Sequence, residues 1–213
     1  MPYRKYDTCF FERYAMTALQ TILGHKFDSL VNNDRPDLQS GDGQSLGIEV
    51  TRAMEQGKLP AQQMLKDLAG VGHGPVSIPA YSYGIAEGNF IGGLELNYWK
   101  TAQPMRHIIR SKVSKVVSGF YGHFDEFALF VFSKDPLSEQ EAISAMKYTM
   151  DLQMGEDLHY SRLFLYCVTT LYACNLEDGL KMDYRLTEFP VNEEMRRDFF
   201  LSSIDYGNNT VIV

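Results

Sequence analysis

The stretch RPDLQSGDGQSLGIEVT, Arg35 to Thr51, decides the expected fold. Two runs with strand character, 36–40 and 45–53, flank the turn sequence GDG. Glycine and aspartate at such a point favour a tight hairpin between antiparallel strands. The hairpin would place Asp37, at the start of the first strand, close to Glu49 in the middle of the second.

The second strand of this hairpin offers oxygen ligands on one face. Glu49 and Thr51 share that face, because side chains alternate along a strand. The carboxylates of Asp37 and Glu49 with the carbonyl of Thr51 make a hard oxygen site of the kind that Mg²⁺ or Mn²⁺ prefers. A metal held there activates water and neutralises charge on a phosphate. The alternative stays open that Asp37 is only a turn residue and that Glu49 only faces solvent.

Hydrophobic periodicity predicts the elements on either side of the hairpin. The expected helices are 10–23, 60–70, 105–122 and 138–153, and the further expected strands are 27–33, 126–133, 162–175 and 179–189. Ser138 and Glu141 form a capping box at the start of one helix. A helical turn and an edge strand are expected in 192–213. A hairpin followed by helix-linked strands predicts an α/β fold with a mixed central sheet flanked by helices.

The size and composition are those of one globular domain. The chain has 213 residues, of which 45% are hydrophobic and 22% charged, so we expect a single domain over 1–213. Residues 71–104 are rich in glycine and aromatic side chains, and we interpret them as an ordered insertion with a small hairpin near 89–96.

The formal net charge of −7 argues against a protein that coats nucleic acid by bulk charge. It does not exclude an enzyme that meets nucleic acid through a local basic patch. The stretch 96–124 contains basic residues and no acid. The candidate nucleic-acid contacts in it are Arg106, Arg110, Lys112 and Lys115. A solvated helix face is the equally open alternative.

The remaining sequence features limit the compartment and the chemistry. No apolar run is long enough for a transmembrane helix, and the N-terminus lacks the pattern of a signal peptide. Cys9, Cys167 and Cys174 are odd in number and lack metal-ligand spacing, which predicts reduced thiols in a cytoplasmic protein without a membrane partner. The five histidines show no paired spacing for zinc.

The motif around Asp37 and Glu49 resembles the signature of the PD-(D/E)XK nuclease superfamily. That pattern has an Asp, often after Pro, at the start of a strand, then a Glu or Asp, one residue and Lys on the next strand. Pro36-Asp37 matches the first part and Glu49 the second. The resemblance implies a restriction-endonuclease-like core with bound Mg²⁺ or Mn²⁺, and it implies that Glu12 on the opening helix assists metal binding. The expected order of helix, three strands, helix and strand also fits that fold.

One position departs from the family pattern, because Thr51 stands where the motif has lysine. Threonine carries no positive charge. In the family that lysine positions the attacking water, and members are known to supply it from another element. Lys66 on the next helix is the first candidate, ahead of Lys112 and Lys115. Gln62 and Gln63 precede Lys66 on this helix, at a place where related nucleases often have a Gln or Lys that faces the metal.

The resemblance therefore implies a divalent-metal-dependent nuclease acting on phosphodiester bonds, most readily those of DNA. The site residues would be Asp37, Glu49, Thr51 and Lys66, with Glu12 as a further metal ligand. The alternative is a catalytically inactive module of the same fold that binds nucleic acid or protein or mediates dimerisation, which the missing lysine and the negative charge favour. Because two strands must be cut, a homodimer is an open alternative to a monomer.

Overall fold

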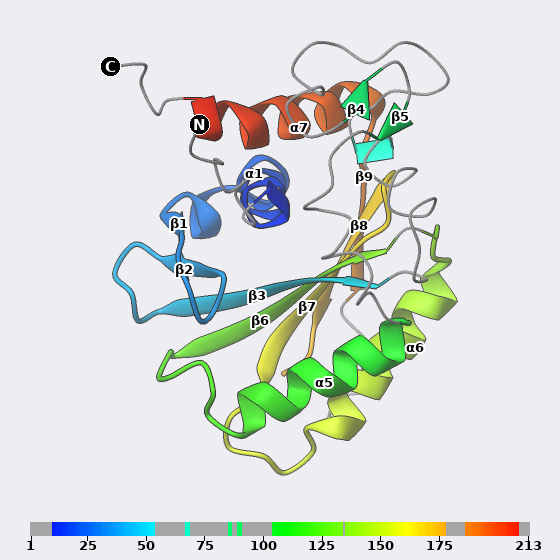
Figure 1. Cartoon of the computed structure of the whole chain (residues 1–213). Helices are drawn as coiled ribbons and strands as arrows, with labels where there is room; N and C mark the ends of the chain where they lie inside the picture. The colour runs from blue at the N-terminus through cyan, green and yellow to red at the C-terminus, as the bar shows by residue number, and fades with distance from the viewer. Residues whose placement is uncertain are drawn as a thin grey trace.

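A seven-stranded mixed β-sheet forms the centre of the protein (Figure 1). The computed structural model describes residues 10–53, 67–68, 85–86, 89–90, 104–133, 135–177 and 186–208. The strands in spatial order are β1 (Leu30–Asn32), β2 (Leu38–Ser40), β3 (Leu46–Ala53), β6 (Glu126–Ser133), β7 (Tyr160–Tyr166), β8 (Thr170–Asn175) and β9 (Leu186–Pro190). The predicted α/β fold class is confirmed.

The middle of the sheet is parallel and its two sides are antiparallel. β3 pairs with β6, and β6 with β7, in parallel, whereas β1–β2–β3 and β7–β8–β9 are antiparallel meanders. β6 is buried along almost its whole length, as expected for a parallel strand covered on both faces. The hairpin predicted around GDG is present as β2 and β3.

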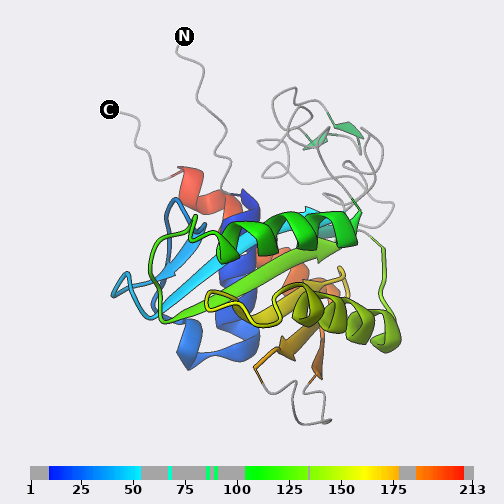
Figure 2. The ribbon, with the colours of Figure 1, turned by 90° about the horizontal axis from the view of Figure 1, so that it is seen from below.

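Helices cover both faces of the sheet (Figures 1 and 2). α1 (Phe10–Leu23) and α7 (Glu193–Asn208) lie on one face, and α5 (Met105–Val117) and α6 (Glu139–Leu152) lie on the other. Each pair has its own hydrophobic core against the sheet. Odd-numbered residues of β3 face α5, because Ile48 and Val50 pack in the α1 core and Ala53 in the α5 core. This alternation decides which helix meets Glu49.

The helix predictions hold closely for α1 and α6, whereas α5 begins as predicted but ends at Val117 instead of 122. The Ser138–Glu141 capping box is formed, with the Glu141 N–H donating to Ser138 Oγ at 3.3 Å and the Ser138 N–H donating to Glu141 Oε2 at 2.8 Å. A short 3₁₀ helix (His25–Phe27) follows α1. Of the predicted helix 60–70, the structure describes only 67–68, which are helical.

The prediction of one long strand over 162–175 is wrong. The chain turns back at 167–169, so that β7 and β8 form an antiparallel hairpin. Val168 occupies the turn with a φ of 55°, a conformation that is unusual for a β-branched residue. The turn sequence Cys167-Val168-Thr169 contains no glycine or asparagine, the residues by which hairpin turns are recognised in a sequence.

The C-terminal prediction of a helical turn and an edge strand is also wrong for the residues described, which form the 16-residue helix α7. Asn192 caps it, because the Met195 N–H donates to Asn192 Oδ1 at 2.8 Å. Residues 209–213 lie outside the described part. Within the insertion, the described residues form a small hairpin of β4 (Ile85–Ala86) and β5 (Asn89–Phe90), earlier in the chain than expected. Among the described residues no helix has the length and apolar character to cross a membrane.

Candidate active site

The β2–β3 hairpin brings Asp37 beside Glu49. Leu38 pairs with Ile48, so the next position of the antiparallel register puts Asp37 opposite Glu49. Asp37 Oδ2 accepts a hydrogen bond from the Val50 N–H at 2.7 Å. This bond fixes the first carboxylate against the strand that carries the second. The predicted juxtaposition of the two acids is therefore present.

Lys112 on α5 supplies a cation to this pair. Its ammonium group donates to Glu49 Oε1 in a direct ion pair. The Lys112 side chain is 16% exposed and that of Glu49 is 7% exposed, so both charges are largely withdrawn from water. A charge so withdrawn needs a partner, since leaving it unpaired costs several kcal/mol, roughly 3–5. Lys112 comes from a helix 63 residues after Glu49 in the chain.

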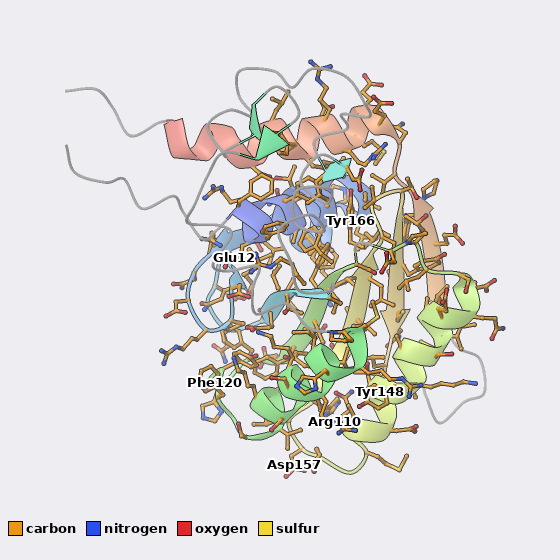
Figure 3. The ribbon with its side chains drawn as sticks, turned by 45° about the vertical axis from the view of Figure 1, so that its right-hand side comes forward. Glu12, Arg110, Phe120, Tyr148, Asp157 and Tyr166 are labelled. Carbon is orange, nitrogen blue, oxygen red and sulfur yellow. The ribbon has the colours of Figure 1, made fainter. Side chains whose placement is uncertain are left out.

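Glu12 approaches the site from α1 on the other side of the hairpin. Asn32 of β1 links the two segments: its Nδ2 donates to Glu12 Oε2 at 2.7 Å and to the Asp37 carbonyl at 3.2 Å. In Figure 3 Glu12 lies at the end of α1 next to the β1–β2 segment. Glu12 is thus close enough to act on Asp37 electrostatically, although its hydrogen bond goes to Asn32.

The three carboxylates repel one another. Burial raises the pKa of Asp37 to about 7, and the charges of Glu49 and Glu12 add to this rise. The Val50 N–H and the Lys112 ammonium oppose it without cancelling it. The site is therefore deficient in positive charge, and a bound cation would relieve the repulsion at Asp37.

Two tyrosines behind Glu49 were not predicted from the sequence. The hydroxyl of Tyr160 donates to the Lys112 carbonyl at 3.2 Å. The Tyr121 side chain is buried near Glu49 and Tyr160, and its hydroxyl makes no hydrogen bond of normal geometry to a described residue. Burial, with Tyr160 and Glu49 nearby, raises the pKa of Tyr121 well above its usual value. Tyr121 therefore stays protonated and neutral there, and no sequence pattern marks it.

The other residues of the predicted motif lie as follows. Thr51 is 7% exposed and shares the α5 face of β3 with Glu49. Arg52 points to the opposite face, where its guanidinium lies 4.5 Å from the centroid of the Phe11 ring, as the alternation predicts. Lys66, the first candidate for the displaced lysine, lies outside the described residues. The same holds for Gln62 and Gln63.

The four basic residues expected to contact nucleic acid divide between two flanks of α5. Lys112 and Lys115 lie toward the hairpin, and Lys112 is bonded to Glu49. Arg106 and Arg110 lie toward α6, where both contact Tyr148: one guanidinium is 5.2 Å from the ring centroid, and Arg110 Nε donates to the hydroxyl at 3.1 Å. Figure 3 shows Arg110 and Tyr148 together where α5 meets α6.

The donors gathered here suit a hard divalent cation in their chemistry, because Asp37, Glu49 and Glu12 offer carboxylate oxygens. Within the described residues no three His, Cys, Asp or Glu side chains are already grouped tightly enough to hold an ion. Mg²⁺ is commonly bound through one or two carboxylates together with several waters. Asp37 and Glu49 provide such a pair.

Comparisons with known proteins leave the geometry as the basis for assigning a function. No family model, no curated protein and no solved structure matches the chain. The chemistry available to the site therefore follows from Asp37, Glu49, Lys112 and their surroundings.

Proposed function

We propose that the protein is a divalent-metal-dependent nuclease that hydrolyses phosphodiester bonds, those of DNA first. The observation that carries this proposal is the meeting of Asp37, Glu49 and Lys112, which come from two strands and a separate helix. Two carboxylates can hold a divalent metal, and an amine beside them can stabilise negative charge on a phosphate, so the three groups together can support metal-assisted hydrolysis of a phosphodiester. Two carboxylates this close repel each other unless a cation lies beside them or one of them is protonated.

In this proposal Asp37 and Glu49 hold Mg²⁺ or Mn²⁺, with Glu12 assisting and the Thr51 carbonyl as a further ligand. When bound, the metal supplies an activated water and neutralises charge on the phosphate. Asp37 is held for this role by its bond from the Val50 N–H. The Asn32 amide keeps Glu12 in place beside the Asp37 backbone.

Lys112 takes the role of the motif lysine that Thr51 cannot take. Its ammonium lies against Glu49 and therefore at the edge of the proposed metal site. An amine there holds a positive charge beside the phosphate and stabilises negative charge that develops during hydrolysis. Supply of this lysine from α5 rather than from β3 agrees with the expected displacement, though from a different helix than Lys66.

The order of elements supports the resemblance to the PD-(D/E)XK superfamily. α1 is followed by the meander β1–β2–β3 and, after the small hairpin β4–β5 of the insertion, by α5 and by β6, which runs parallel to β3. This is the succession of helix, three strands, helix and strand that the resemblance implied. Membership of that superfamily remains a proposal that rests on this order and on the motif.

The proposal includes the setting of the enzyme. Nucleic acid is the partner, contacted through basic residues of α5, and no membrane is involved. A cytoplasmic location goes with it, because Cys167 and Cys174 are buried free thiols. A homodimer would allow both strands of a duplex to be cut.

A second candidate function is a non-catalytic module of the same fold that binds nucleic acid or protein or acts as a dimerisation subunit. The observation that favours it is the direct contact between Lys112 and Glu49. That contact compensates the buried charge of Glu49 without any metal, so the pair also satisfies a purely structural role.

A cleavage assay separates the two functions. We expect the wild-type protein to degrade at least one member of a panel of single- and double-stranded DNA and RNA with Mn²⁺ or Mg²⁺, and none with a chelator. Asp37→Asn should abolish cleavage, and Asp157→Asn, an exposed acid on the far side of α5 in Figure 3, should not. Metal-independent cleavage, or equal activity in both variants, would refute the nuclease function. Strand binding without cleavage supports the module.

A further inference from the structure

Phe120 is an exposed aromatic ring with two cations close to it. Its side chain is 46% exposed, and every other phenylalanine and tyrosine side chain described in the structure is buried or half-buried. The Arg35 guanidinium lies 5.4 Å from its ring centroid and the Lys115 ammonium 5.0 Å. An apolar ring at the surface of an acidic protein, flanked by positive charge, is suited to a ligand that is both aromatic and anionic.

The end of α5 fixes Phe120 in this position. The Phe120 N–H donates to the Lys115 carbonyl at 3.1 Å, and the Gly119 N–H donates to the Val116 carbonyl at 3.0 Å. Gly119 has a φ of 72°. These two bonds and the left-handed glycine form a Schellman motif, in which the residue after the glycine packs back on the last helical turn. Phe120 is therefore presented by a rigid helix end beside Lys115.

The two flanking cations belong to the segments that also carry the candidate active site. Lys115 follows Lys112 by three residues on α5, so both project from the same side of the helix. Arg35 precedes Asp37 by two residues. Arg35 has a φ of 61°, which few residues other than glycine adopt.

Gly47 allows this segment to lie close on β3. A Cβ atom at Gly47 would come within 2.6 Å of Pro36 Cγ and 3.2 Å of the Phe124 ring, so only glycine leaves room for both. Gly47 precedes Glu49 by two residues on the same face of the strand. Arg35, which contacts the Phe120 ring, therefore belongs to the segment that packs on β3 through Pro36 and continues into Asp37.

We propose that Phe120, Arg35 and Lys115 form a platform on which an unpaired nucleobase of the substrate stacks, beside the phosphate that is cut. This inference rests on the proposed nuclease function and deepens it, because it makes the substrate single-stranded at the site. The face of an aromatic ring accepts any base. The two cations contact the flanking phosphates, whereas the bases of a continuous duplex are stacked on each other and cannot reach the ring.

Tyr148, another aromatic side chain with cations beside it, is a matched control. Its ring is half-buried between α5 and α6, is covered by Arg106, and its hydroxyl accepts a bond from Arg110. Figure 3 shows Phe120 near the hairpin end of α5 and Tyr148 on the opposite flank. The Tyr148→Ala variant therefore tests whether any aromatic ring beside basic residues of α5 is enough to bind a single strand.

The experiment measures binding of a fluorescein-labelled oligothymidylate and of a labelled duplex hairpin by fluorescence anisotropy, in a chelator so that neither is cut. We expect Phe120→Ala to weaken binding of the single strand about 5- to 150-fold, the loss of one stacked base, and Phe120→Trp to preserve it. Tyr148→Ala should leave it unchanged. Lys115→Met should lower the salt slope of strand binding by about 0.7, one phosphate contact.

Several results would overturn the platform. The platform is wrong if the wild-type protein does not bind the single strand, or if Phe120→Ala binds it normally. It is also wrong if Phe120→Ala weakens binding of strand and duplex equally, or if Tyr148→Ala weakens strand binding more than Phe120→Ala does. Thermal unfolding of each variant shows that it is folded. Because binding is measured without metal, failure of the metal site at Asp37 and Glu49 is read separately, from Mn²⁺ titration of the same proteins.

Discussion

Replacement of Lys112 by methionine tests the centre of the site without any substrate. Methionine keeps an unbranched apolar stem and removes the charge, so the main loss is the partner of Glu49. Because Glu49 is only 7% exposed and Lys112 only 16% exposed, the remaining carboxylate lacks water to replace the amine. Breaking a buried pair in this way costs about 3–5 kcal/mol. We expect the free energy of unfolding to fall by about 3 kcal/mol.

Two further variants make the cause specific. Lys26→Met breaks an ion pair with Glu126 whose side chains are 41% and 33% exposed, so we expect a loss below about 1 kcal/mol. The double variant Lys112→Met/Glu49→Gln removes both charges together. It should recover most of the loss, because a neutral amide costs less to bury than a carboxylate.

Urea unfolding followed by circular dichroism, at neutral pH in a chelator, measures these free energies, and equal slopes in all variants show that the transitions are comparable. With the single variant Glu49→Gln completing the double-mutant cycle, we expect Lys112→Met and Glu49→Gln to couple by about 1–3 kcal/mol. A stabilising role of the buried ion pair is refuted if Lys112→Met lowers the free energy of unfolding no more than Lys26→Met does. It is also refuted if the effects of Lys112→Met and Glu49→Gln simply add, because the buried ion pair would then not stabilise the packing of α5 on β3.

Further substitutions should change the stability of the protein in specific ways. The raised pKa of Asp37 means that its charged form destabilises the fold: this cost is absent below the unfolded pKa of about 4 and is complete above about 7. A difference of about three in pKa is worth up to about 4 kcal/mol, so Asp37→Asn should stabilise the metal-free protein at pH 8 and not at pH 4. A variant that is destabilised at pH 8 would contradict this. Tyr121→Phe should leave the free energy of unfolding in urea unchanged or raise it by about 1 kcal/mol, because the hydroxyl it removes has no partner among the described residues, whereas Tyr160→Phe should lower it by about 1 kcal/mol. Gly119→Ala should cost about 1 kcal/mol, or about 2–4 °C in the thermal midpoint, because alanine disfavours positive φ; an unchanged midpoint would argue against the helix-end motif.

The hairpin and most helices were predictable because their signals are local. The GDG turn and the alternation around Glu49 set the register of β2 and β3, and that register alone brings Asp37 alongside. The Ser138–Glu141 capping box needs only four consecutive residues to be recognised. Asn192 and the acids that follow it are also local signals of a helix start, and they mark the beginning of α7.

The identity of the site lysine was not predictable, because it depends on packing across the sheet. The basic residues of α5 are equivalent in composition, and only the face that the helix turns toward β3 selects Lys112. The turn at Val168 failed for another reason: tertiary packing holds a valine at a φ of 55°, against its own preference. Tyr121 had no signal at all, since burial beside Glu49 is what makes it distinctive.

The most direct test of the central claim is calorimetric titration with Mn²⁺ of the wild-type protein, of Asp37→Ala and of Glu49→Ala, with Asp157→Asn as the control. The account predicts one site of micromolar to millimolar affinity in the wild type and in the control. Each of the two alanine variants should lose it, because both carboxylates hold the same ion. Equal and negligible heats in all four proteins, or binding that survives both alanine substitutions, would contradict a metal site at Asp37 and Glu49.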